Sequence, residues 1–182
     1  MRERRSFQRE DVLLVDGYNI IGSWPELTEL KEERLEDARD RLLDMLSDYQ
    51  SYAGLVVIVV FDAFRVPGAG KEYRPRKKFS VVYTRERETA DECTERLVGE
   101  WLSVKRNVYV ATSDLVEQHV VLGLGALRVS ARELLHAVRQ SRADIRTAIR
   151  SDRQLKKNPL EGVLPEDVQR RLERMRRGLK DS

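Results

Sequence analysis

The segment Leu55–Phe61, with the sequence LVVIVVF, is the feature that most constrains how this chain folds. Seven apolar residues follow one another without interruption, and most are β-branched. A half-exposed strand would alternate polar and apolar residues, so an unbroken run is typical of a strand that is covered on both faces. Such strands belong to parallel sheets with helices on both sides. Because Val12–Val15 forms a second run of this kind, we predict an α/β fold.

Helical patterns separate the apolar runs. Apolar residues three and four positions apart predict a helix from about Arg34 to Ala53, which Gly54 ends. Capping boxes that begin at Thr89 and Ser130 predict two further helices. We predict additional strands at Phe79–Tyr83, Val108–Ala111 and Ala126–Val129, and a loop over Ala63–Lys78. Strands that alternate with helices indicate right-handed crossovers, and therefore one α/β domain with a central, mostly parallel sheet flanked by helices.

The length and composition exclude several classes of protein. With 182 residues, the chain suits a single domain with a tail. Cys93 is the only cysteine, which excludes an internal disulfide and suits a reducing compartment. The longest apolar run is far shorter than the roughly 20 residues of a membrane span, and the first eleven residues lack the apolar segment of a secretory signal. We therefore expect a cytoplasmic protein without a membrane partner.

Basic residues are concentrated in a few segments although the net charge is only +3. Eight lie between positions 65 and 87, against two acids, and seven lie between positions 139 and 157, again against two acids. This segregation favours a polyanionic partner, while solvated loops and helix faces are the alternative explanation. The candidate substrate-binding cations of the first segment are Arg65, Lys71, Arg74, Arg76, Lys77 and Lys78.

Acidic residues follow three of the predicted strands. Asp16 follows Val15, Asp62 follows Phe61, and Asp114 comes shortly after Ala111. The carboxyl ends of parallel strands share one edge of a sheet, where ligands bind in open α/β folds. We therefore expect these acids to converge, together with Asp91, which lies in the first turn of the helix predicted after Thr89.

Four carboxylates at one edge repel one another unless cations lie between them. Oxygen ligands suit Mg²⁺ or Mn²⁺, and such a centre activates water and neutralises charge on a phosphodiester. Each acid also has a structural explanation: Asp16 as a turn residue, Asp62 as a polar strand end, Asp91 in a favourable helix dipole and Asp114 as an N-cap.

Three polar residues near these acids are candidates for holding substrate. Asn19 is placed to orient a phosphate or a water, and the alternative is a turn residue. Thr112 and Ser113 are expected to hydrogen-bond either the acids or a phosphate, and the alternative is helix capping. We interpret Cys93 as a core residue because it lies on the apolar face of its helix. Tyr18 stands where a phosphatase of the dehalogenase type has its second aspartate, which argues against that class.

The residues quoted above, in this order, resemble the YacP-like NYN domains, a branch of the PIN-like nuclease superfamily. The matching stretches are LLVDGYNIIGSWPEL (13–27), EDARDRLLDMLSDYQSY (36–52), VIVVFDA (57–63), TRERETADE (84–92), VATSDLVEQ (110–118) and GLGALRVSARELL (123–135). The resemblance implies a metal-dependent endoribonuclease that cleaves messenger RNA in association with the ribosome. It assigns Asp16, Asp62, Asp91 and Asp114 to the catalytic metal-binding positions and Asn19 to the amide of the motif.

These expectations define a domain plan and its rivals. We predict a basic N-terminal arm over residues 1–11, the nuclease domain over 12–150, and a basic, partly helical tail over 151–182. The expected cofactor is Mg²⁺ or Mn²⁺, and the expected partners are RNA and the ribosome. Two alternatives stay open at this point: an RNA- or ribosome-binding module without catalysis, and a nuclease of the same fold that acts on DNA.

Overall fold

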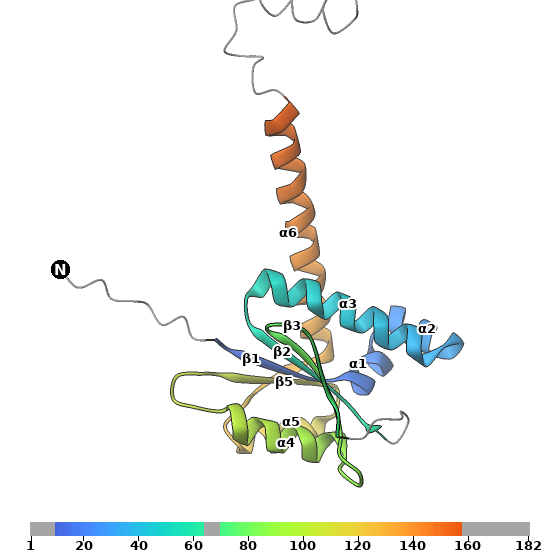
Figure 1. The fold of residues 1–182 in the computed structure, drawn as a ribbon, viewed down its shortest axis with the longest axis vertical. Coiled ribbons are helices and arrows are strands. Elements are labelled where there is room, and N and C mark those ends of the chain that lie inside the picture. Colours follow the sequence, from blue (N-terminus) through green and yellow to red (C-terminus); the bar gives the residue numbers. More distant parts are fainter. Residues whose placement is uncertain (1–9, 64–69, 158–182) are drawn as a thin grey trace, which may run out of the picture. The chain divides into compact units, whose positions relative to one another are not determined.

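The computed structural model describes residues 10–63 and 70–157. The elements follow in the order β1 (Val12–Asp16), α1 (Gly17–Ser23), α2 (Pro25–Glu33), α3 (Leu35–Ala53), β2 (Val56–Phe61), β3 (Glu72–Arg76), β4 (Phe79–Tyr83), α4 (Ala90–Trp101), β5 (Val108–Thr112), α5 (Leu115–Gly123), β6 (Leu127–Ser130) and α6 (Ala131–Lys157) (Figure 1). The chain divides into two compact units, Met1–Arg142 and Ala143–Ser182, and α6 runs from the first into the second. The sheet belongs to the first unit.

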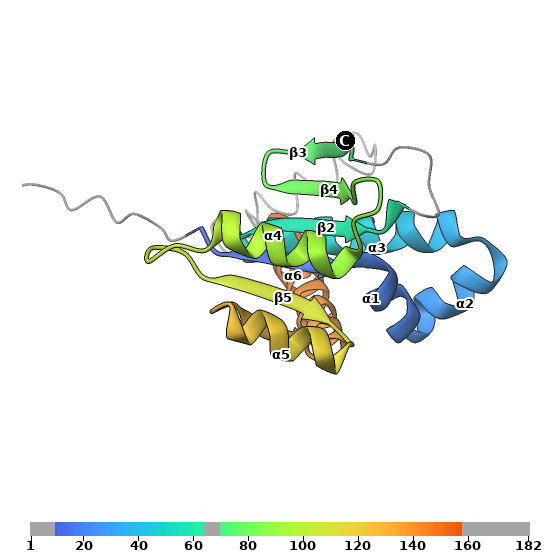
Figure 2. The same ribbon diagram turned by 90° about the horizontal axis from the view of Figure 1, so that it is seen from below.

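The six strands form one sheet in the order β3-β4-β2-β1-β5-β6 (Figure 2). All neighbouring strands are parallel except β3 and β4. In the centre of the sheet, Val12 pairs with both Val56 and Val108, so β1, β2 and β5 run in register. The predicted α/β architecture, with a mostly parallel sheet flanked by helices, is therefore confirmed.

Each face of the sheet carries its own core, which explains why the central strands are apolar throughout. On one face, Trp24, Leu42 and Leu134 pack from the α1–α2 junction, α3 and α6. On the other face, Leu97 of α4 and Val121 of α5 pack against the strands. Figure 1 shows α3 on one side of the sheet and α4 and α5 on the other. Among the described residues, no helix is long and apolar enough to cross a membrane.

Three elements differ from the prediction. The stretch Ala63–Lys78 was expected to be a loop, but part of it forms the edge strand β3. All five residues of β3 are exposed, so no apolar alternation announces it, and Pro75 is tolerated because an edge strand needs no complete ladder. The short helices α1 and α2 were also not predicted, since Gly17, Gly22 and Pro25 interrupt their pattern.

Gly17 is the first residue of α1 and lies against the core rather than in a turn. A Cβ at this position would lie 2.2 Å from the Phe61 ring. That ring is fully buried and held between Tyr18, in an edge contact at 5.0 Å, and Tyr83, stacked at 5.9 Å. The ring therefore has little room to move. A glycine here allows the backbone after Asp16 to approach the sheet closely.

Gly17→Ala should destabilise the protein by about 1–3 kcal/mol, because it overpacks the core at Phe61. Thermal unfolding should then begin several degrees lower, roughly 2–4 °C for each kcal/mol in a chain of this size. Gly22→Ala is the matched control in the same helix, since a Cβ there meets nothing within 4 Å. The control should be neutral or stabilising, because alanine favours a helix. Equal melting temperatures for the two variants would contradict the close packing.

Candidate functional site

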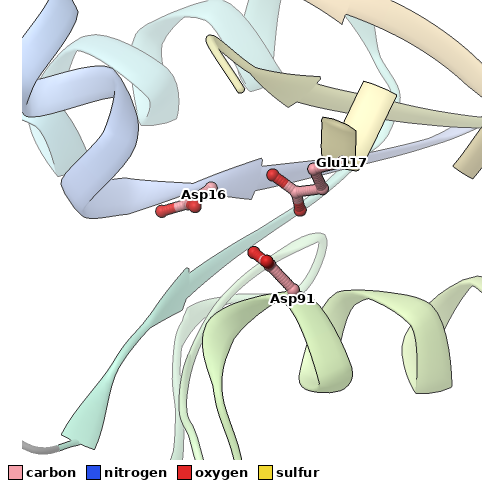
Figure 3. Close-up of side chains that lie close together, drawn as sticks. All are labelled: Asp16, Asp91 and Glu117. Carbon is pink, nitrogen blue, oxygen red and sulfur yellow. The ribbon is translucent and has the colours of Figure 1, made fainter. Parts of the chain in front are cut away.

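Three carboxylates meet at the carboxyl edge of the sheet. Asp16 ends β1, Asp91 lies in the first turn of α4, and Glu117 lies in α5. Each offers one oxygen, and these oxygens all lie within 4.8 Å of one another. Figure 3 shows the three side chains converging from their separate elements. We call Asp16, Asp91 and Glu117 the acidic cluster.

Local structure fixes each member of the acidic cluster. Asp16 is the N-cap of α1, where Oδ1 accepts a hydrogen bond of 3.1 Å from the Asn19 amide. Thr89 and Glu92 form a complete capping box that sets the start of α4, and thereby the position of Asp91. These bonds satisfy amides that a helix leaves free at its N-terminus. The acids are therefore held by the folded backbone.

Asp114 has the same capping role for α5. Its Oδ1 accepts hydrogen bonds from the amides of Val116, at 2.7 Å, and Glu117, at 3.3 Å. The cap fixes the first turn of the helix that carries Glu117. The carboxylate of Asp114 also adds negative charge beside the cluster, since it raises the pKa of Asp16, Asp91 and Glu117.

Burial and mutual repulsion make the charged form of Asp16 costly. Only 8% of Asp16 is exposed. The pKa of Asp16 is raised to about 6, chiefly by burial; the hydrogen bond from the Asn19 backbone N–H lowers it, and the charges of Asp91, Asp62 and Asp114 contribute to the increase. The pKa of Asp91 is also raised, by burial first and then by Asp114 and Glu92. A bound cation would therefore stabilise the ionised forms of both carboxylates, because it would offset their burial and their repulsion from neighbouring acids.

Glu117 is the most unusual member of the cluster. It is 3% exposed, and neither of its carboxylate oxygens has a hydrogen-bond partner among the described residues. Its pKa is raised to about 7, chiefly by burial and in smaller part by the charges of Asp16, Asp91 and Asp114. The nearby Thr112 hydroxyl offsets part of the increase, although it does not meet hydrogen-bond geometry toward either oxygen. Buried carboxylates without partners are rare because they are strongly destabilising.

The acidic cluster fits a divalent cation. It offers only carboxylate oxygens, which hard cations such as Mg²⁺ and Mn²⁺ prefer. A cation among Asp16, Asp91 and Glu117 would satisfy the orphaned oxygens of Glu117 and remove the repulsion that raises all three pKa values. The burial of two of the three carboxylates limits competition from water.

The structure arranges the sequence-predicted acids unequally. It brings Asp16 and Asp91 together, as their positions at one sheet edge predicted, but adds Glu117, which was not among the predicted site residues. Asp62 and Asp114 lie near enough to raise the pKa of Asp16, yet neither belongs to the group within 4.8 Å. A signal for Glu117 was present in the sequence, because it is the only acid in α5, a helix whose residues are mostly apolar.

Asn19 joins α1 to the turn after β5. Its side-chain oxygen accepts hydrogen bonds from the Ser113 amide, at 2.6 Å, and from the Ser113 hydroxyl. Asn19 thus braces the turn that precedes Asp114. Thr112 is fully buried, and its hydroxyl accepts from the Asp114 amide at 3.1 Å. The substrate contacts predicted for Asn19, Ser113 and Thr112 stay predictions, and Ser113 is the more exposed of the last two.

The basic residues predicted to hold substrate lie on and around the hairpin of β3 and β4. Arg65 lies outside the described residues. Among the others, Arg74 pairs with Glu72 at 2.7 Å, and Lys78 pairs with Glu10 at 3.1 Å. All the described members of this group are exposed except Lys78, which is half-buried. We call this group the basic hairpin residues: Lys71, Arg74, Arg76, Lys77 and Lys78.

Cys93 belongs to the core, as its position in α4 predicted. It is fully buried, and burial raises the pKa of its thiol to about 11. A thiol with this pKa is almost entirely protonated near neutral pH, so it is a poor nucleophile. The chemistry of the site therefore rests on its carboxylates.

Comparison with known proteins identifies the family of the chain. The model of the YacP-like NYN domain matches residues 13–177. YacP of Bacillus subtilis (strain 168) is 44% identical over 168 residues, which cover 92% of this chain and 98% of YacP. The crystal structure of Rae1 (YacP) from Bacillus subtilis is similar, with a TM-score of 0.70 and 44% identity over 92% of this chain and 95% of that one.

A second crystal structure, of the W164L mutant of Rae1 (YacP), gives a TM-score of 0.68 and 45% identity over 78% of this chain and 82% of that one. The family match spans all three members of the acidic cluster. The chain belongs to the YacP-like NYN domain family, within the PIN-like nuclease superfamily.

Proposed function

We propose that this protein is a metal-dependent endoribonuclease that hydrolyses internal phosphodiester bonds of RNA. The observation that carries the proposal is the acidic cluster, in which Glu117 is buried with both oxygens unpartnered at the sheet edge where Asp16 and Asp91 converge. Asp16, Asp91 and Glu117 would hold one or two Mg²⁺ or Mn²⁺ ions. When bound, such ions activate water and neutralise the charge that develops on a phosphodiester.

The remaining residues would position the substrate and the cluster. Asp62 and Asp114 add negative charge beside Asp16 and favour the cation there. Asn19 and Ser113 hold the turn before Asp114 and are proposed to contact a phosphate. The basic hairpin residues Lys71, Arg74, Arg76, Lys77 and Lys78 are proposed to bind the RNA backbone, since phosphate contacts supply most of the sequence-independent affinity for nucleic acid.

We further propose that the substrate is messenger RNA engaged with the ribosome in the cytoplasm. The resemblance of the motifs in residues 13–135 to the ribosome-associated branch of the family supports this finer assignment. The segregated basic segments support it as well, because ribosomal RNA and messenger RNA are both polyanionic.

A circular single-stranded RNA gives the sharpest test, because only an endonuclease converts it to a linear form. With the full chain, linear RNA should appear with Mg²⁺ or Mn²⁺ and disappear with excess EDTA. A circular DNA of the same sequence and a reaction containing translating ribosomes are run beside it. Salt-sensitive binding without new RNA ends, unchanged by EDTA, would instead indicate a binding module. Faster cleavage of the DNA circle would indicate a DNA nuclease.

A further inference from the structure

A second concave site lies beside α4, away from the acidic cluster. It is a pocket of about 240 Å³ whose apolar residues are Ile58, Val82 and Leu97, with Trp101 as the aromatic neighbour; Tyr83 also lines it, but its ring stacks on Phe61 in the core of the other face. Figure 2 shows β3 and β4 beside α4 rather than behind it, so among the described elements no helix of this face extends over the β3–β4 edge of the sheet. The polar lining residues are Lys71, Glu72, Arg74, Arg85, Arg96 and Glu100, and Gly70 completes the wall.

The pocket continues along the helix that carries Asp91. Arg96 is the first pocket residue on α4, five positions after Asp91, and Trp101 ends the helix. With a rise of 1.5 Å per residue, Arg96 lies about 7.5 Å along the axis from Asp91. The pocket therefore begins within the reach of a polymer bound at the acidic cluster and extends away from it.

The charged groups of the pocket fall into two sets. Arg74 is paired with Glu72, and Arg96 bridges Glu88, at 2.9 Å, and Glu100, at 3.1 Å. These pairs neutralise both acids of the pocket. Among the described residues, Lys71 and Arg85 form no salt bridge, and both are exposed. They are the cations that a phosphate group would find available.

Trp101 gives the pocket a fixed aromatic wall. The Arg106 guanidinium lies over its ring, 4.9 Å from the centroid, and restrains it. An aromatic side chain beside free cations is the combination that binds single-stranded nucleic acid, since every base has a face that stacks. At about 240 Å³, the pocket is slightly smaller than the roughly 300–1,000 Å³ of most ligand sites and so suits one planar ring.

We propose that this pocket binds one unpaired nucleotide of the RNA strand near the cleaved phosphodiester. The base would lie against Trp101 and the apolar floor, and the phosphate would contact Lys71 and Arg85. A base in a duplex is stacked and paired, so the pocket selects single-stranded RNA. The inference rests on the proposed function, which supplies RNA as the ligand and places the cleaved phosphodiester at the acidic cluster.

The test measures binding alone. A labelled single-stranded RNA oligonucleotide is titrated with the full chain in EDTA, and fluorescence anisotropy gives the Kd at several salt concentrations. Lys71→Gln should weaken binding about five- to tenfold near 0.1 M salt and reduce the salt slope by about one. Lys31→Gln, an equal charge change on the exposed surface of α2, should match the parent. Intrinsic fluorescence reports whether the RNA binds beside Trp101, since Trp101 and the buried Trp24 are the only tryptophans of the chain.

RNA should quench the fluorescence of the parent, and a Trp101→Leu variant should lose both this quenching and at least about fivefold in affinity. Equal Kd values and salt slopes for Lys71→Gln and Lys31→Gln would overturn the inference, as would a parent whose fluorescence RNA leaves unchanged. The two proposals fail separately. Quenching by RNA that is lost in Trp101→Leu, without any cleavage by the parent, would preserve the pocket and refute the nuclease. Normal cleavage by the parent, with Kd values for Lys71→Gln and Trp101→Leu equal to that of the parent, would refute the pocket and leave the nuclease standing.

Discussion

Asp16→Asn should reduce RNA cleavage on the order of a thousandfold while leaving the fold intact. Asparagine has the shape of aspartate and caps a helix equally well, so the hydrogen bond that the backbone N–H of Asn19 donates to position 16 is retained. What the substitution removes is the negative charge of a buried ligand within 4.8 Å of Asp91 and Glu117. Because that charge is costly without a cation, the metal-free variant should be at least as stable as the parent.

Conversion of the circular RNA, measured at saturating Mg²⁺, is the readout for Asp16→Asn. Asp44→Asn is the matched control, since Asp44 is exposed on α3 and lies outside the acidic cluster. Asp91→Asn should behave like Asp16→Asn, because Asp91 belongs to the same group of oxygens. Cleavage by Asp16→Asn at the rate of Asp44→Asn would show that the cluster is not the catalytic centre.

The sequence predicted the sheet well because its central strands are buried on both faces. The runs that contain Val12–Val15 and Leu55–Phe61 carry that burial directly in their residues, and both became central strands. The edge strand β3 was missed because its residues are all exposed and it is defined by its pairing with β4. Pattern therefore predicts strands where burial is complete and fails where pairing alone decides.

The same limit applies to the site. Asp16 and Asp91 were predicted because a strand end and a capping box fix their direction from local sequence. Glu117 depends on how α5 is oriented over the sheet, which only tertiary packing sets. Its role was therefore hidden behind the ordinary preference of acids for a helix's first turn. The Asn19–Ser113 contact joins residues far apart in the chain and was likewise out of reach.

Glu117→Gln should lower cleavage at least tenfold and remove much of the stabilisation that Mg²⁺ gives the protein. Glutamine keeps the size of the side chain but offers a weaker, neutral ligand oxygen. Since a ligand that binds only the folded state raises the melting temperature, Mg²⁺ should raise that of the parent and raise that of the variant much less. Glu29→Gln, exposed on α2, is the matched control and should respond to Mg²⁺ as the parent does.

The pH dependence of stability separates a buried acid from an ordinary surface one. In the metal-free protein, the pKa of Glu117 is about 7, above the ordinary glutamate value of 4.5 that describes the unfolded chain. The folded state therefore binds its proton more tightly, so the contribution of Glu117 to stability is complete below pH 4.5 and is lost as the pH rises to about 7. The pKa of Asp16 is raised from 3.8 to about 6, so its contribution to stability is likewise lost as the pH rises, but between about pH 3.8 and pH 6.

Glu117→Gln removes one of these two titrations. In EDTA, the free energy of unfolding of the variant relative to the parent should increase on the order of 2–3 kcal/mol between pH 4 and pH 8, as denaturant titrations would measure. Saturating Mg²⁺ should cancel or reverse this gain at pH 8, because the cation stabilises the ionised carboxylate only in the parent. A pH-independent difference between variant and parent would mean that Glu117 does not titrate in the folded protein. An equal response of the two proteins to Mg²⁺ would mean that Glu117 does not contribute to a cation site.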